Sequence, residues 1–269
     1  KKIPEFKSIN YNMSLDEFKV IFYWEYAHRF IARLIGLIAI IPLIWIYFKY
    51  KKKLNNDLKY LLIFTLICLQ GLLGWFMVKS GLVYNIDVSH YRLSLHLSVA
   101  LIILSLIFWF ILESLKINKF KLKINNRFLT FFLVIILIQI ILGAFLAGLN
   151  GGLLYNSWPD MNGSFFPDDI IQKDLYNTSS LDNPSIIQFY HRLVAYILII
   201  FLIILNYIFF SKKIKSMSII FFNLAIFFQI ILGILTLITG VKIYYASLHQ
   251  LGSIIVLTSF LFIYYKNTN

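Results

Sequence analysis

Long apolar runs separated by short polar segments make up most of the chain. Each run is long enough to cross a hydrocarbon layer of roughly 30 Å as a helix. An open strand could not satisfy its backbone hydrogen bonds in lipid, so helix is the expected form. The pattern therefore predicts an all-α, polytopic membrane protein with seven transmembrane helices. The expected spans are residues 22–48, 60–78, 91–112, 128–147, 188–210, 218–240 and 246–265.

Composition supports this class of protein. Hydrophobic residues make up 60% of the 269 positions and charged residues 14%, whereas ordinary soluble domains are roughly 45–50% apolar and about 25% charged. These values exclude a soluble globular domain and a disordered chain. The single cysteine, Cys68, lies inside an apolar run, and one cysteine excludes an intramolecular disulfide.

Lysines gather in three loops, at residues 49–59, 113–127 and 211–217. The positive-inside rule places these loops in the cytoplasm, with the N-terminus outside and the C-terminus inside. The net charge of +13 is then a topology signal, and we expect no nucleic-acid partner.

One long connection, residues 148–187, interrupts the regular spacing of the spans. It is rich in Gly, Asn, Asp, Ser and Pro. A connection of this length usually carries a function or joins two domains. The aromatic anchors within it favour an ordered external loop that packs over the outer face: Tyr155, Trp158, Phe165 and Phe166.

A five-residue segment recurs along the chain. Gln139-Ile-Ile-Leu-Gly143 returns letter for letter as Gln229-Ile-Ile-Leu-Gly233, and Gln70-Gly-Leu-Leu-Gly74 is a looser copy. Its glycines let helices approach closely, or let a flat cofactor approach the backbone. The sequence leaves both readings open.

The recurring segment belongs to a longer repeat. A His-Arg doublet, the Gln-x-x-Leu-Gly segment and a second histidine follow one another twice, once with His28 and His96 and once with His191 and His249. The repeat predicts two pseudo-symmetric four-helix bundles related by an axis along the membrane normal. The halves are residues 1–127 and 128–269, the second including loop 148–187. By symmetry a further helix is expected before His28, upstream of this sequence.

The four histidines of the repeat are expected at one depth, in the first turns of helices that start from the outside. A lone histidine there is typically an interfacial anchor, but two repeat-related pairs favour metal or heme ligation. Zinc sites usually have four ligands that include cysteine or carboxylate. Two imidazoles in an aromatic, apolar setting suit the axial positions of a heme. His90 has no counterpart in the repeat and is expected on the surface.

Acid and arginine positions distinguish the two halves. Glu25 precedes His28 by three residues and shares its helix face, while Gln188 stands at the corresponding place before His191. The acid can move protons or orient an imidazole, or it can simply be a solvated carboxylate at a helix start. The asymmetry indicates that the first half performs chemistry and the second holds a cofactor. Outside the lysine-rich loops, the arginines can pair with heme propionates or reach lipid phosphates: Arg29, Arg33, Arg92 and Arg192.

Taken in order, these segments resemble the heme A synthase family along nearly the whole chain. The matching segments are Glu25-Tyr-Ala-His28-Arg29, Arg33-Leu-Ile-Gly36, Gln70-Gly-Leu-Leu-Gly-Trp-Phe-Met-Val-Lys-Ser-Gly81, Val88-Ser-His-Tyr-Arg-Leu93, His96, Asn150-Gly-Gly152, Gln188-Phe-Tyr-His-Arg192 and His249-Gln250. The resemblance implies eight transmembrane helices in two four-helix bundles, of which this chain lacks the first. The absence of an external cysteine pair resembles the cysteine-free branch of mitochondria and related bacteria.

The resemblance also implies an activity and a set of roles. The family oxidises a methyl group of heme O to the formyl group of heme A for cytochrome oxidase. His191 and His249 would ligate a cofactor heme b, and His28 and His96 would face the substrate heme O. Glu25 would be the acid needed for activity, with Arg29, Arg92 and Arg192 toward the hemes.

The expected surroundings follow from the same resemblance. They are the lipid bilayer of a bacterial plasma membrane or a mitochondrial inner membrane, heme O synthase as the supplier of substrate, and an electron donor of unknown identity. A homo-oligomer is compatible with the sequence. The alternatives are a di-heme b-type cytochrome that transfers electrons, and a heme carrier without chemistry.

Overall fold

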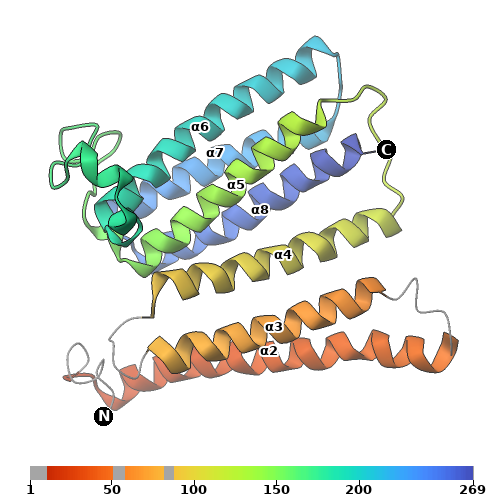
Figure 1. The fold of residues 1–269 in the computed structure, drawn as a ribbon, viewed down its shortest axis with the longest axis horizontal. Coiled ribbons are helices and arrows are strands. Elements are labelled where there is room, and N and C mark those ends of the chain that lie inside the picture. The colour runs from red at the N-terminus through yellow and green to blue at the C-terminus, as the bar shows by residue number, and fades with distance from the viewer. Residues whose placement is uncertain (1–10, 51–57, 82–87, 269) are drawn as a thin grey trace. The chain divides into compact units, whose positions relative to one another are not determined.

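Seven long helices make up the computed structural model, which describes residues 11–50, 58–81 and 88–268 (Figure 1). All seven are long and apolar enough to cross a membrane, which confirms the predicted all-α class and the number of spans. Residues 1–10 of the N-terminal segment and 51–57 of the first lysine-rich loop lie outside the described residues. The helices are α2 (Leu15–Tyr50), α3 (Leu58–Gly81), α4 (His90–Ser114), α5 (Asn126–Gly148), α6 (Pro184–Ser211), α7 (Met217–Ile238) and α8 (Ile243–Asn267).

The first helix, α2, begins at Leu15 and not at residue 22 as predicted. Ser14 and Glu17 form a capping box: the Ser14 backbone N–H donates to Glu17 Oε2 at 2.8 Å, and the Glu17 N–H donates to Ser14 Oγ at 3.3 Å. Two orphan backbone donors are thereby satisfied, so a polar stretch forms the start of the helix. His28 consequently lies roughly three and a half turns into α2, not in its first turns.

The chain forms two compact units, residues 1–106 and 107–269. The end of α4 and the segment after it belong to the second unit because they bind the end of α8. The Phe120 N–H donates to the Lys266 carbonyl at 2.7 Å. The side chain of Asn267 accepts from Ile124 N–H at 2.7 Å and donates to its carbonyl at 2.9 Å. The predicted functional halves and their pseudo-symmetry remain predictions.

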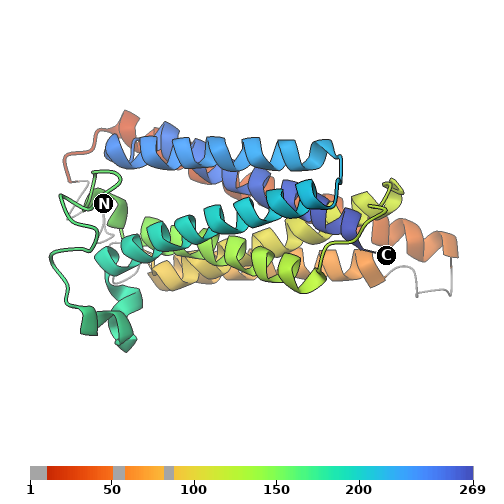
Figure 2. The ribbon, with the colours of Figure 1, turned by 90° about the horizontal axis from the view of Figure 1, so that it is seen from above.

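In the second unit, α5 to α8 pack side by side (Figures 1 and 2). Their shared core contains Phe132, Phe222 and Phe260, all fully buried, with the Phe132 and Phe260 ring centroids 4.7 Å apart. Asn206 on α6 and Asn223 on α7 exchange amide hydrogen bonds of 2.9 and 2.8 Å. Apolar packing and this reciprocal amide pair together fix the helices against one another.

The long connection between α5 and α6 is ordered, as predicted. It contains the 3-10 helices η2 (Gly151–Leu153), η3 (Gln172–Tyr176) and η4 (Thr178–Asp182). Tyr155 and Met161 are buried, and Asn156 donates to the Leu237 carbonyl of α7 at 2.9 Å. The connection therefore packs on the ends of the helices of the second unit.

Candidate functional site

Two histidines come together within the second unit. His191 lies in the second turn of α6, whose start is fixed by Asn183: its side chain accepts from the N–H groups of Ser185 and Ile186 at 2.9 and 3.2 Å. His249 lies in the second turn of α8. The two imidazoles are close enough to interact electrostatically, so the predicted pair is brought together.

His249 has a defined tautomer. Its Nδ1 lies 3.1 Å from the backbone carbonyl of Gln229, and a carbonyl can only accept. Nδ1 therefore carries the proton, and the lone pair is on Nε2. Metal-ligating histidines usually donate their other ring N–H to a backbone carbonyl or carboxylate in this way.

A glutamine and a glycine of the preceding helix flank each ring of this pair. Gln139 Nε2 lies 3.2 Å from His191 Nε2, and Gln229 Nε2 donates to the His249 carbonyl at 2.9 Å. A Cβ added at Gly143 would lie 3.2 Å from His191 Cε1. One added at Gly233 would lie 2.9 Å from His249 Cε1. The glycines of the repeated segment thus allow a close approach between helices, and the group that approaches them is a histidine ring of the next helix.

The first unit repeats this arrangement on His96. The ring lies against Gly74, where a Cβ would be 2.9 Å from Cε1. Gln70 Nε2 lies 3.3 Å from His96 Nε2 and donates to the His96 carbonyl at 3.0 Å. His28 on α2 interacts electrostatically with His96, so the second predicted pair also lies within one unit.

Glu25 forms an ion pair with Arg29, one turn further along α2. Their side chains are 53% and 48% exposed, so the pair lies at a surface of the described residues. Glu25 stands roughly three turns into the helix, and the helix dipole acts only on the first turn. A carboxylate favoured by the helix start is therefore the wrong interpretation of this residue.

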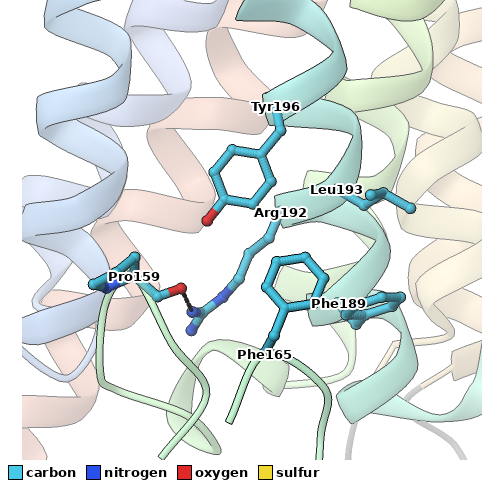
Figure 3. A pocket seen from close by; sticks show the side chains of 6 residues that line it. All are labelled: Pro159, Phe165, Phe189, Arg192, Leu193 and Tyr196. Carbon is cyan, nitrogen blue, oxygen red and sulfur yellow. Dashed lines mark hydrogen bonds between the residues drawn. The ribbon is translucent and has the colours of Figure 1, made fainter. Parts of the chain in front are cut away.

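Gln188 and Arg192 occupy the same two positions on α6 and reach a different partner. Gln188 is 1% exposed and donates to the Tyr155 carbonyl at 2.9 Å. Arg192 Nη2 donates to the carbonyls of Tyr155 and Ser157 at 3.0 and 3.1 Å, and Nη1 donates to that of Asp160 at 2.6 Å. Figure 3 shows the same guanidinium reaching the Pro159 carbonyl, at 3.5 Å.

The guanidinium of Arg192 therefore holds the long connection through its backbone. Its Nε is buried without a hydrogen-bond partner among the described residues. Arg92, the other arginine expected near a heme, lies over the Phe76 ring at 5.0 Å. The sequence could not show the contacts of Arg192, because backbone carbonyls of an irregular segment leave no side-chain pattern.

The Tyr155 side chain gives the connection a second anchor. Its hydroxyl oxygen lies 2.7 Å from a carboxylate oxygen of both Asp168 and Asp169. Ser185 Oγ, at the start of α6, donates to Asp169 at 2.5 Å. Burial raises the pKa of the Tyr155 hydroxyl, and the two carboxylates raise it further, so the phenol stays protonated. The connection is thus tied directly to the helix that carries His191.

The donor set fits a heme held between two imidazoles. Each unit offers one pair of histidines, and no group of three or more His, Cys, Asp or Glu side chains gathers in the described part of the chain. Such pairs match axial heme ligation and fall short of the usual four-ligand zinc site. The Nδ1 atoms of His96 and His191 are buried and lack hydrogen-bond partners among the described residues.

Comparison with known proteins agrees with this chemistry. Residues 1–261 match the COX15-CtaA family, described as cytochrome oxidase assembly proteins. The chain is 62% identical over 269 residues to the heme A synthase of Pelagibacter ubique, covering 100% of this chain and 80% of that protein. It is 39% identical over 274 residues to the heme A synthase of Rickettsia felis, covering 98% and 80%. A heme A synthase of Rickettsia bellii is 39% identical over 271 residues, with the same coverage.

Proposed function

This chain belongs to the COX15-CtaA family and is a heme A synthase, an oxidoreductase, and we propose which of its residues bind a resident heme and which act on the substrate. We propose that His191 and His249 hold a resident heme b, while His28 and His96 face heme O, the substrate. Because the chain belongs to this family, heme A synthesis is favoured over the two alternative functions, an electron-transferring cytochrome and a heme carrier.

The second pair suits a resident cofactor because its surroundings are fixed. The backbone carbonyl of Gln229 holds the His249 tautomer, and Gly143 and Gly233 leave room for the two rings. Heme held by two imidazoles supplies one-electron transfer when bound. The connection tied down by Arg192 covers this end of α6, and it would keep water and exchange partners away from the pair.

The first pair suits a substrate because an acid stands beside it. Oxidation of a methyl group to a formyl group involves proton transfers at the reacting site, and a carboxylate near the substrate can donate or accept those protons. Glu25 lies one turn before His28 on the same face of α2, and Arg29 holds the carboxylate in place. Arg29 and Arg92 are the proposed partners of the substrate propionates. The Arg192 Nη groups already bind loop carbonyls, so we assign Arg192 to a heme only through its remaining Nε.

The membrane setting completes the proposal. The chain is a multi-pass membrane protein with seven candidate spans. We place its lysine-rich loops in the cytoplasm, which puts both histidine pairs toward the outer side of a bacterial plasma membrane. Heme O synthase supplies the substrate in this scheme, and a separate donor supplies electrons.

The observation that carries the proposal is the difference between two equivalent positions, acidic Glu25 beside one pair and amide Gln188 beside the other. Pigments extracted from the purified protein after aerobic expression test it. Heme B together with heme A, or with a partly oxidised heme O, is the expected result. Heme B alone, in cells that also make heme O, would contradict it. A His90→Ala variant, changed outside both pairs, serves as the control and should give the wild-type pigments.

A further inference from the structure

We infer that the glutamine and glycine of each Gln-x-x-Leu-Gly segment are positioning residues that set the ring plane of the histidine on the next helix. The inference rests on the proposed heme ligation by these histidines and deepens it. It assigns a role to Gln70, Gln139 and Gln229, and to the glycines that follow each of them by four residues.

The glycine contacts support the inference because they recur on three separate helix pairs. A Cβ added at Gly74, Gly143 or Gly233 would lie 2.9, 3.2 and 2.9 Å from Cε1 of a histidine ring. Cβ contacts below 3.0 Å are essentially never seen. By contrast, Gly36 and Gly71 have nothing within 4 Å of an added Cβ. A Cβ at Gly74 or Gly233 would therefore force the ring to move, and one at Gly143 would make a tight contact with it.

The glutamine of each segment contacts the same histidine as the glycine that follows it. A spacing of four residues puts the glutamine and the glycine on one helix face, so together they flank the ring. Gln70 and Gln229 donate to the carbonyls of His96 and His249 at 3.0 and 2.9 Å. Gln139 Nε2 lies 3.2 Å from His191 Nε2, and Gln70 Nε2 also lies 3.3 Å from His96 Nε2. Each amide is therefore bound to the histidine residue whose ring its glycine admits.

His249 is held most firmly of the three. The backbone carbonyl of Gln229 accepts from its Nδ1, and the Gln229 amide donates to its carbonyl. Gly252, one turn further along α8, leaves space for that amide, because a Cβ there would collide with Gln229 Oε1. Gln229 thus contacts both parts of His249: its side-chain amide binds the His249 backbone, and its main-chain carbonyl binds the ring.

Ring orientation has a measurable consequence. The g values of low-spin ferric heme with two imidazole ligands depend on the angle between the ring planes. Partners that orient a ligand typically change metal affinity by 10–100-fold when removed. A residue that only lets two helices pack closely would change the stability of the fold and leave the g values alone.

The test uses the full-length protein with its heme, in two variants. Gly233→Ala pushes the His249 ring, and Gln229→Met removes the amide while keeping the side-chain length. We expect both to retain fold and heme, with shifted g values and heme affinity weaker by roughly 10–100-fold. Controls are Gly71→Ala, with open space around the added Cβ, and Gln250→Met, whose exposed side chain adjoins His249 in sequence. Both should match wild type.

Three outcomes separate the possibilities. Shifted g values in the two variants and unchanged controls support the positioning role. If Gln229→Met only lowers the unfolding temperature and leaves the g values unchanged, these residues serve helix packing alone and the inference is overturned. This holds whether or not Gly233→Ala folds. A wild-type low-spin spectrum in His249→Ala would instead show that the proposed ligation itself is wrong.

Discussion

The N-terminal parts of α2 and α6 carry the same short pattern and use it differently. In α2, Glu25 and Arg29 bind each other and remain about half exposed. In α6, Gln188 and Arg192 bind the carbonyls of the connection after α5, and Gln188 is buried. The two arginines directly follow the histidines of the two pairs.

This difference shows how one exchanged residue redirects its neighbour. A carboxylate four residues before an arginine binds the guanidinium on the helix surface. An amide cannot form that ion pair, so Arg192 is free to donate outward to Tyr155, Ser157 and Asp160. Glu25 and Arg29 thus stay about half exposed on α2, whereas Gln188 and Arg192 attach the connection after α5 to α6.

The largest expected effect is the loss of a whole heme. His191→Ala or His249→Ala removes one of the two imidazoles proposed to hold heme b, so each variant should lose that heme and its low-spin spectrum. Heme content per protein and the optical spectrum measure this. Full retention of low-spin heme in both variants would remove the distinction between the two pairs.

The next effect is on turnover. Glu25→Gln gives α2 the residue that α6 already carries, so the fold and the resident heme should survive. Losing a proton-transferring carboxylate should slow formation of heme A by roughly 10²–10⁴-fold. The extracted pigments should then contain heme B and accumulated heme O. Wild-type amounts of heme A would exclude the acid from the reaction, and loss of all heme would make it structural.

Releasing the connection between α5 and α6 from Arg192 should have a smaller effect. Arg192→Leu removes the donors that hold four loop carbonyls, and each bond from a charged donor contributes about 1.5–3 kcal/mol when buried. Because the guanidinium is partly exposed, we expect a loss of roughly 2–3 kcal/mol, confined to residues 153–170. The rate of protease cleavage there should rise by at least roughly tenfold. Arg29→Leu is the matched control and should leave that rate unchanged.

The smallest effect comes from the reverse exchange. Gln188→Glu places a buried carboxylate oxygen against the Tyr155 carbonyl in place of a donor, which should cost about 1–3 kcal/mol of unfolding free energy. Glu25→Gln should cost less than about 1 kcal/mol, since exposed ion pairs contribute little. Thermal unfolding of the two variants measures the contrast. Equal losses would mean that the two positions are equivalent after all. No second active centre is expected in Gln188→Glu.

The helices and the histidine pairs could be predicted because each leaves a trace in sequence. Apolar runs define the spans, and the repeat links His28 to His96 and His191 to His249. The apolar pattern does not predict the start of α2, because the residues before position 22 are largely polar, yet Ser14-Leu-Asp-Glu17 is a readable capping box.

Other features depend on contacts that no pattern reveals. Arg192 binds carbonyl groups, which every residue has, so its partners depend on the path of an irregular segment. Gly143 and Gly233 could be expected at close contacts, but the contacting group is known only once neighbouring helices are placed. These contacts distinguish a histidine whose ring is fixed by its neighbours from a histidine that is only buried.

The central claim is that one heme is resident and the other exchanges, and an exchange experiment tests it most directly. Purified protein carrying heme B and heme O is mixed with excess heme-free myoglobin, and each pigment is followed over time. Heme O is expected to leave at least roughly tenfold faster than heme B. Arg192→Leu is expected to speed the loss of heme B alone. Equal rates of loss in the wild-type protein, or faster loss of heme B, would contradict it.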